Sequence, residues 1–244
     1  LDIGTTNIKM LLVDERGSVV KSMSHPLELS APRPAWAEQD PEDWWNGVWT
    51  LLSSVPSDMN VLRIGLSGQM HTLVPVDSEG NVLRKAILWC DQRTSAECDE
   101  ATAAVGGEEK IIEMTGNLIY PGFTLPKILW IRKNEPEVYS RISTCFIAKD
   151  YIGWRLTGER AAEWSDASGS SCYDVSARRW RSDLLRTLGI DEAWLPSVKG
   201  SSDIRGKLRP ELASKLGWKQ AEFVCGGADN AVAALGLGVC SPGD

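Results

Sequence analysis

The first residues of the chain combine side chains that could bind phosphate. Within "DIGTTNIK", a glycine lets backbone amides approach an anion, and the hydroxyls of Thr5 and Thr6 can donate to phosphate oxygens. Asn7 adds a polar group, Lys9 adds a positive charge, and Asp2 could hold a hydrated Mg²⁺. A polar hairpin turn would use the same residues, and the segment matches neither the G-x-x-x-x-G-K-[ST] loop nor the G-x-G-x-x-G turn. The stretch therefore indicates phosphate binding without identifying the class of protein.

A second polar stretch follows a predicted strand in "GLSGQMHTL". Gln69, Met70 and His71 come directly after Ser67 and Gly68, at the end of that strand. A lone histidine is more often structural than functional. Strand ends in α/β proteins are nevertheless where ligand contacts gather, and glutamine with histidine suits a ligand that has several hydroxyls. Both interpretations stay open on the residues alone.

A third stretch, "GGADNAVAAL", places Asp229 and Asn230 at the start of a predicted helix directly after a strand. Aspartate is a common N-cap, so a purely structural role is one interpretation. Two glycines just before it allow a close backbone approach and would leave Asp229 exposed at the rim of the sheet. A carboxylate in that position could take a proton from a substrate hydroxyl, as a general base does in phosphoryl transfer.

Two further features are interpreted as structural. The chain has eleven tryptophans, and the helical spacing of Trp44, Trp45 and Trp49 predicts that most of them pack in the core. Asp91 and Arg93 in "WCDQRT" could contact a ligand, but an ion pair that fixes a loop is the favoured interpretation. Neither feature is included among the candidate catalytic residues.

The elements that must position these residues alternate between strands and helices, which predicts an α/β fold. Acidic and glycine residues predict hairpin turns at 14–17 and 78–81, and "VLRIGLSG" reads as a buried strand. Capping and periodicity signals predict helices within 40–55, 94–104, 108–116, 125–136, 149–158 and 182–189, and after residue 228. Residues 198–206 are predicted to form a surface loop. A mixed sheet with a leading β-hairpin and helices on both faces accommodates this order.

Composition limits the classes of partner. The 244 residues carry a net charge of −7 with both signs interspersed, so we expect neither nucleic acid nor an anionic membrane surface as a partner. The six cysteines form no C-x-x-C pair and are expected to be reduced and mostly buried. No run approaches the roughly 18 apolar residues of a membrane span, and we expect a cytoplasmic protein. A homodimer stays open.

The order and spacing of these motifs resemble the N-terminal domain of the FGGY carbohydrate kinases. "DIGTTNIK" is similar to the first phosphate motif of that family, and "GFTLPKILWIRKN" at 122–134 matches its signature segment. "GGADNAVAALGLGV" resembles the stretch that carries the catalytic aspartate. The resemblance covers the whole chain and implies a ribonuclease H-like domain of the actin-like ATPase superfamily.

Within the family, the Gln-Met-His version of the second stretch resembles xylulokinases, whereas glycerol kinases carry arginine and glutamate at the positions of Met70 and His71. "TGNLIYPGFTLPK", "AKDYIGWRLTGE" and "SDASGSSCYDV" are also similar to bacterial xylulokinases. Ala228 and the pair Ser171-Cys172 depart from the common pattern. These departures leave the exact sugar open.

The resemblance implies a role for each candidate residue. Asp229 would be the general base toward the sugar hydroxyl, Met70 and His71 would contact a ketose, and Asn230 would be a further sugar ligand. Toward the cofactors ATP and Mg²⁺, the implied residues are Thr5, Thr6, Asn7 and Lys9 for the phosphates and Asp2 for the metal.

Domain organisation follows from the same resemblance. Residues 1–244 correspond to the sugar-binding and catalytic-base domain, and a C-terminal domain that completes the nucleotide site is absent from this sequence. We therefore expect the chain alone not to phosphorylate its sugar at a useful rate. D-xylulose is the expected substrate. The alternatives are another ketose, polyol or aldonate such as ribulose, glycerol or gluconate, and a non-catalytic sugar sensor on the same fold.

Overall fold

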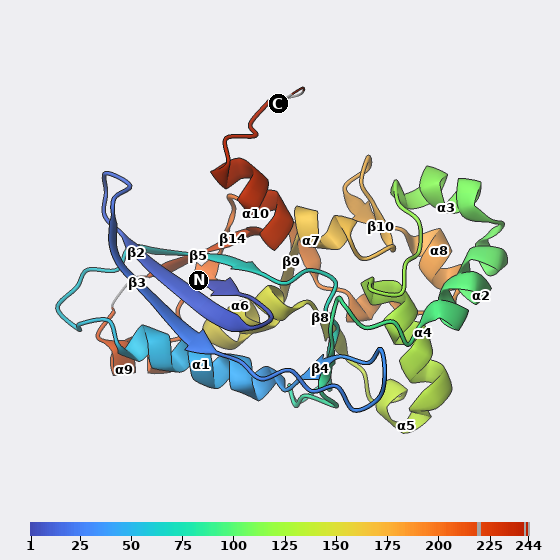
Figure 1. Cartoon of the computed structure of the whole chain (residues 1–244), viewed down its shortest axis with the longest axis horizontal. Coiled ribbons are helices and arrows are strands. Elements are labelled where there is room, and N and C mark those ends of the chain that lie inside the picture. The colour runs from blue at the N-terminus through green and yellow to red at the C-terminus, as the bar shows by residue number, and fades with distance from the viewer. Residues whose placement is uncertain (219–220, 242, 244) are drawn as a thin grey trace.

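A six-stranded mixed sheet forms one side of the molecule, as the computed structural model shows (Figure 1). The structure describes residues 1–218, 221–241 and 243. The strand order is β13-β14-β5-β1-β2-β3. The strands are β1 (Asp2–Ile3), β2 (Asn7–Val13), β3 (Val19–Pro26), β5 (Arg63–Gly68), β13 (Ile204–Lys207) and β14 (Glu222–Ala228).

Three neighbouring strands of this sheet run parallel. β1 pairs with β5 and β5 pairs with β14, whereas β2, β3 and β13 are antiparallel to their neighbours. The predicted leading hairpin is confirmed as β2 and β3, with the Asp14 carbonyl accepting from the N–H of Gly17 in the turn. Parallel strands end at the same edge, so the segments that follow β1, β5 and β14 must lie near one another.

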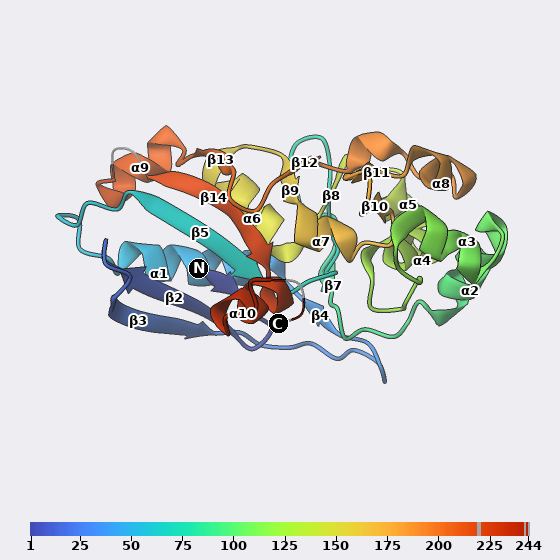
Figure 2. The same ribbon diagram turned by 90° about the horizontal axis from the view of Figure 1, so that it is seen from above.

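Helices cover both faces of the sheet, as the sequence predicts (Figure 2). α1 (Pro41–Ser53) and α6 (Ala148–Thr157) pack on one face, and α10 (Asp229–Gly236) packs on the other. A Cβ on Gly68 would lie 3.3 Å from Lys149 Cβ of α6, and a Cβ on Gly227 would lie 3.0 Å from Val232 Cγ1 of α10. Successive residues of a strand therefore point alternately to the α6 face and to the α10 face.

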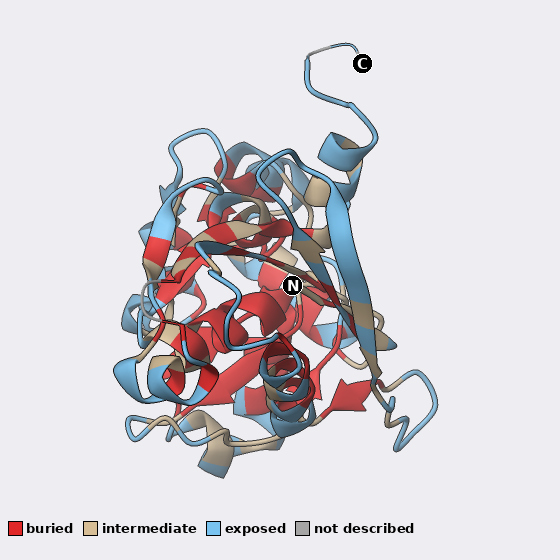
Figure 3. Cartoon of the chain, turned by 90° about the vertical axis from the view of Figure 1, so that its left-hand side faces the viewer, coloured by how far each residue is buried: buried red, intermediate tan, exposed pale blue. Residues whose placement is uncertain are grey.

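Local sequence explains why α1 forms and which side it buries. Asp40 accepts a hydrogen bond from the N–H of Glu42, and Pro41 begins the helix. Trp44, Val48, Leu51 and Leu52 are buried at helical spacing. One hydrophobic cluster lies between the sheet, α1 and α6, while the β2–β3 hairpin forms a largely exposed edge (Figure 3).

A second, mostly helical part contains its own hydrophobic cluster (Figure 1). Its helices are α2 (Ser95–Val105), α3 (Glu108–Thr115), α4 (Thr124–Asn134), α5 (Pro136–Tyr139) and α8 (Ser182–Thr187), with the 3₁₀ turn Glu192–Trp194. Two further helices lie beside the sheet, α7 (Trp164–Ser168) and α9 (Pro210–Leu216). Small two-stranded sheets join the parts and contain β4 (Glu38–Gln39), β6 (Val74–Val76), β7 (Ala86–Ile87), β8 (Thr144–Phe146), β9 (Ala161–Glu163), β10 (Tyr173–Asp174), β11 (Arg179–Trp180) and β12 (Ser197–Lys199).

One local prediction is confirmed with irregular pairing, and two need correction. The hairpin predicted around 78–81 forms, with its two arms joined at the bridges Val76–Val82 and Leu73–Ile87, and β6 also pairs with β8. The predicted loop at 198–206 contains the end of β12 and most of β13, because each pairs with a distant strand that a local pattern does not reveal. The helix predicted over 125–136 ends at Asn134, and α5 begins separately at Pro136.

The predictions for cysteine and tryptophan are borne out in their main point. Four of the six cysteines, Cys98, Cys145, Cys172 and Cys225, are buried. Most tryptophans are buried in or packed against the two hydrophobic clusters, whereas Trp89 is 48% exposed. Among the described residues, no helix combines the length and apolar character needed to cross a membrane.

Candidate active site

The three predicted stretches meet at the edge where β1, β5 and β14 end. Ile3 and Ala228 both pair with Gly68, so the three parallel strands finish in register. The N–H of Gln69 donates to the Ile3 carbonyl at 2.9 Å, which ties the loop after β5 to the end of β1. Asp229 follows β14 at the same edge. The structure therefore brings together residues that are more than 200 positions apart in the sequence.

Asp2 lies on the sheet face that α10 covers, directly across from Lys9 of β2. Its Oδ1 atom is buried and has no hydrogen-bond partner among the described residues. A buried carboxylate oxygen without a donor is unfavourable unless a cation or water satisfies it. Mg²⁺ is typically held by one or two carboxylates together with water and phosphate oxygens. The donor set at Asp2 therefore fits this metal.

The turn between β1 and β2 is fixed by hydrogen bonds from Gln39 and Trp89 to Thr5. A Cβ on Gly4 would lie 2.8 Å from the Asn7 carbonyl oxygen, so the turn requires glycine there. Gln39 Nε2 donates to the Thr5 carbonyl at 2.7 Å, and Trp89 Nε1 donates to Thr5 Oγ1 at 2.9 Å. Because Thr5 Oγ1 accepts from the indole, its own proton stays available for an anion.

The other predicted phosphate ligands line the same turn. Asn7 Nδ2 donates to Thr6 Oγ1 at 3.1 Å, and the Thr6 carbonyl accepts from the N–H of Leu27 at 2.9 Å. The side chains of Thr6 and Lys9 are exposed. The turn thus presents hydroxyl, amide and ammonium donors on a backbone that is fixed to β3 and to Gln39.

Gln69 differs from the expectation that it faces a ligand. Its side chain is 1% exposed, and its Nε2 atom donates to Gln39 Oε1 at 3.1 Å. Its Oε1 atom accepts from Thr72 Oγ1 at 3.1 Å. Gln39 in turn accepts from the indole N–H of Trp44 and holds Thr5. Gln69 therefore connects the phosphate turn to the histidine loop instead of contacting a ligand.

His71 has an unusual backbone conformation. Its φ is +62°, and the N–H of Thr72 donates to the Met70 carbonyl at 2.6 Å. An i to i+2 hydrogen bond around a residue with positive φ is a γ-turn of the rare, strained kind. Such a conformation costs about 1–3 kcal/mol and persists only where surrounding contacts enforce it. Strain of this kind gathers at functional sites.

The His71 ring is held as a neutral imidazole. Nδ1 lies 2.7 Å from the Gly169 carbonyl oxygen, and the ring stacks on Phe123 with centroids 4.2 Å apart. Burial lowers the pKa of His71 to about 4, although the Gly169 carbonyl favours the protonated form. Because Nδ1 donates to this carbonyl, Nε2 has the lone pair and can accept a hydrogen bond from a hydroxyl. A Cβ on Gly169 would lie 3.4 Å from Met70 Cε, so Met70 lines the same place.

Asp229 is the first residue of α10, and its predicted neighbour Asn230 is exposed there. The N–H of Asn230 donates to Asp229 Oδ1 at 2.8 Å. Burial raises the pKa of Asp229, the Asn230 hydrogen bond opposes this, and the nearby charge of Asp2 raises it further. A half-buried carboxylate with a raised pKa, next to a second carboxylate, has the properties of a general base.

A bulge lies in β14 shortly before Asp229. The register between β14 and β5 shifts between Val224 and Gly227. Gly226 has φ +75°, and a Cβ there would lie 1.6 Å from the Leu66 carbonyl oxygen. Only glycine permits this approach, as the sequence predicts for the double glycine.

Comparison with known proteins agrees with this geometry. The domain described as "FGGY family of carbohydrate kinases, N-terminal domain" matches residues 1–236. The chain belongs to this family. It is 39% identical over 246 residues to a xylulose kinase of Klebsiella pneumoniae, covering 100% of this chain, and 39% identical over 242 residues to the xylulose kinase of Escherichia coli, covering 98%.

A solved xylulose kinase from Rhodospirillum rubrum superimposes on this FGGY domain with a TM-score of 0.94, at 32% identity over 100% of the chain. This match confirms the actin-like ATPase fold. The chain covers 50% and 49% of the two curated relatives and 51% of the solved structure. It therefore spans about half the length of the relatives that it matches.

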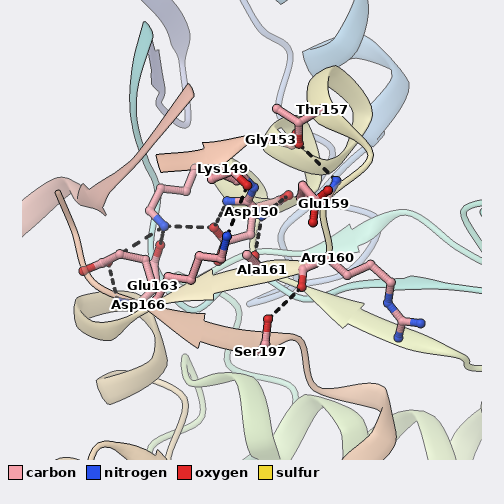
Figure 4. Close-up of polar contacts among 12 residues, drawn as sticks. Lys149, Asp150, Gly153, Thr157, Glu159, Arg160, Ala161, Glu163, Asp166 and Ser197 are labelled. Atoms are coloured by element: carbon pink, nitrogen blue, oxygen red, sulfur yellow. Dashed lines mark hydrogen bonds and ion pairs between the residues drawn. The ribbon is translucent and has the colours of Figure 1, made fainter. Parts of the chain in front are cut away.

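A buried charged cluster joins residues of α6, β9, α7 and β13 in this FGGY domain (Figure 4). Lys149 Nζ lies 2.8 Å from Asp166 Oδ2 and 3.0 Å from Asp150 Oδ1, and Arg205 Nη1 lies 2.8 Å from the same Asp150 oxygen. Glu163 is the third acid of the cluster, 3.9 Å from Lys149 Nζ. All five side chains are at most 1% exposed. Burial raises the pKa of Asp166 to about 7, against the opposing effect of Lys149.

This charged cluster is connected by two hydrogen bonds to Ala228, at the end of β14. The N–H of Ala228 donates to Ser165 Oγ at 2.9 Å, and Ser165 Oγ donates to Glu163 Oε2 at 2.6 Å. Ala228 immediately precedes Asp229. The local sequence gives no sign of this connection, because Ser165 and Ala228 lie 63 residues apart.

The ion pair predicted in "WCDQRT" is confirmed. Arg93 Nη2 lies 2.7 Å from Asp91 Oδ2, and both side chains are at most 1% exposed. Asp91 also accepts from the N–H of Ala37 at 2.7 Å, and Arg93 bonds Glu38 at 2.8 Å. The pair thus joins its loop to the segment around β4. Sequence reasoning missed the residues that orient the site, among them Gln39, Phe123, Ser165 and Gly169.

Proposed function

We propose that this FGGY domain is the sugar-binding and catalytic-base half of an ATP-dependent sugar kinase, with D-xylulose as its substrate and D-xylulose 5-phosphate as its product. The observation that carries the proposal is the half-buried Asp229, with its raised pKa, beside Asp2 and the turn at Thr5. The identity to xylulose kinases supports the choice of sugar.

Asp229 is the general base in this proposal. Its carboxylate takes the proton of the attacking sugar hydroxyl while the hydroxyl oxygen forms a bond to the terminal phosphorus of ATP. The bond from that phosphorus to the bridging oxygen breaks, and ADP leaves with the electron pair. Phosphoryl transfer needs mainly positioning, charge neutralisation and one well-placed base.

The remaining roles follow from where the side chains lie. Met70 and the neutral His71 would contact the ketose, with Nε2 accepting from a sugar hydroxyl, and Asn230 would be a further sugar ligand. The donors of the turn, Thr5, Thr6, Asn7 and Lys9, would bind the phosphates. Asp2 would hold Mg²⁺, which supplies positive charge to the phosphate oxygens when bound.

A coupled kinase assay of the full-length protein tests the substrate. With equal concentrations of D-xylulose, ribulose, gluconate and glycerol, we expect kcat/KM to be highest for D-xylulose. A clear preference for gluconate or glycerol would replace the proposed sugar and keep the proposed reaction. Absence of phosphorylation with every sugar would favour the non-catalytic sensor instead.

The chain alone should not turn over. Its relatives are about twice as long, and we propose that the missing half is the C-terminal domain that completes the nucleotide site. ADP production by residues 1–244 with D-xylulose and ATP should therefore stay at background, while the full-length protein is active. Turnover by the isolated chain at the full-length rate would contradict this division of labour. A cytoplasmic location and a homodimer stay predictions.

A further inference from the structure

The first turn of α4 lies against the backbone carbonyl of His71. Lys127 Nζ donates to this carbonyl oxygen at 2.8 Å, and Thr124 Oγ1 donates to the same oxygen at 3.1 Å. Lys127 Nζ also donates to the Gly122 carbonyl at 2.7 Å. These contacts span 53 and 56 residues of sequence, so they are tertiary contacts that α4 makes with the loop after β5.

Burial of the Lys127 amine carries a desolvation cost, and hydrophobic packing alone does not explain why a lysine occupies this position. Its side chain is 0% exposed, and no carboxylate forms an ion pair with it in the part of the chain that the structure describes. Burial lowers its pKa to about 7, opposed by the charge of Asp91. A methionine would fill similar space without desolvating an amine. The two carbonyl contacts are therefore what the ammonium group provides at this position.

We propose that Lys127, assisted by Thr124, is a positioning residue that holds the Met70–Thr72 γ-turn and so presents the His71 ring to the sugar. The carbonyl of His71 is fixed by α4, while its ring is fixed by the Gly169 carbonyl and by Phe123. Only the sugar contact in this inference rests on the proposed function. The backbone clamp stands on the contacts themselves.

Both ends of His71 must be held because the γ-turn is strained. A residue with φ near +62° relaxes toward negative φ when its carbonyl partners are lost. The ring packs directly on Gly169, where a Cβ would lie 2.3 Å from His71 Cε1, so a change of the His71 backbone should break the 2.7 Å contact of Nδ1 with the Gly169 carbonyl. Loss of the clamp should therefore free Nδ1 and mix the two neutral tautomers.

Nitrogen NMR of the imidazoles in the full-length protein tests the clamp. His25 on β3, the other histidine of residues 1–244, serves as a control within each spectrum. In the unsubstituted protein we expect His71 to be fixed with its proton on Nδ1. In Lys127→Met we expect a mixture of Nδ1–H and Nε2–H forms, with unchanged His25 signals. Loss of a nearby charge alone would raise the pKa of His71 but would not exchange the tautomer.

Thr124→Val provides a second variant, which removes one donor to the same carbonyl without a change of charge. We expect the same change in the His71 signals as in Lys127→Met, with smaller amplitude. This variant also keeps the test decisive if Lys127→Met does not fold. Retention of the fixed Nδ1–H form in Thr124→Val and in any folded Lys127→Met protein would overturn the proposal.

Kinetics separate the clamp from the sugar contact. If His71 binds the sugar equally in the ground state and the transition state, Lys127→Met should raise KM for D-xylulose about 10-fold and change kcat less. KM for ATP should stay the same. If the fixed Nδ1–H form of His71 is lost while KM for D-xylulose stays unchanged, the sugar contact at His71 is overturned. The proposed kinase reaction itself would be contradicted only by absent turnover in the unsubstituted protein.

Discussion

Replacing Asp229 with asparagine should lower kcat of the full-length protein by about 100- to 10,000-fold, the range that a positioned general base contributes. Asparagine keeps the size of the side chain and can keep the hydrogen bond from the N–H of Asn230, but its amide oxygen cannot take the hydroxyl proton. The sugar KM should change less than kcat, because the proton is transferred only in the transition state. Steady-state kinetics with D-xylulose and ATP measure both constants.

The matched control is Asp99→Asn, the same chemical change at an exposed residue of α2. Its kcat should equal that of the unsubstituted protein.

The raised pKa of Asp229 also predicts that the acid limb of the kcat/KM profile lies above the ordinary aspartate value of 3.8, because activity falls as the base becomes protonated. Unchanged kcat in Asp229→Asn would remove this carboxylate from the chemistry and would favour a different base.

The parts of the site that the sequence predicts are those with a local physical cause. The double glycine before Asp229 indicates a close backbone approach, and the structure places Gly226 against the Leu66 carbonyl. Glycine and hydroxyl residues at the start of the chain indicate an anion-binding turn, and Gly4 is sterically required there. Each signal depends on residues that are adjacent in sequence. The resemblance to the FGGY family then predicts that these separate stretches belong to one site.

What the sequence does not reveal depends on contacts between distant segments. Gln69 looks like a ligand residue beside His71, yet its bond to Gln39 turns it into the interior. The γ-turn at His71 is disfavoured locally, because a γ-turn with positive φ at its central residue is rare and strained. It forms because α4 supplies donors from more than 50 residues away. No periodicity within the loop contains that information.

The buried charged cluster is a further case, and it leads to the largest predicted effect on stability. Lys149→Met should lower the free energy of unfolding by about 3–5 kcal/mol, as expected when one partner of a buried ion pair is removed. Three acids, Asp150, Glu163 and Asp166, would then face Arg205 as the remaining cation of the cluster. Urea denaturation of the full-length protein, followed by tryptophan fluorescence, measures the change.

The matched control is Lys110→Met, the same substitution at a lysine that is 47% exposed and lies 2.7 Å from the exposed Glu113. Exposed ion pairs contribute about 0–1 kcal/mol, so this variant should stay within that range.

The loss of unfolding free energy in Lys149→Met should also be smaller at pH 6 than at pH 8. Burial already raises the pKa of Asp166 to about 7, and acids that lose a cationic partner bind protons more readily still. Equal effects of the two substitutions would contradict the prediction, because they would mean that the cluster rearranges without cost when Lys149 is lost. The hydrogen bonds from Ala228 to Ser165 and from Ser165 to Glu163 would then not depend on Lys149.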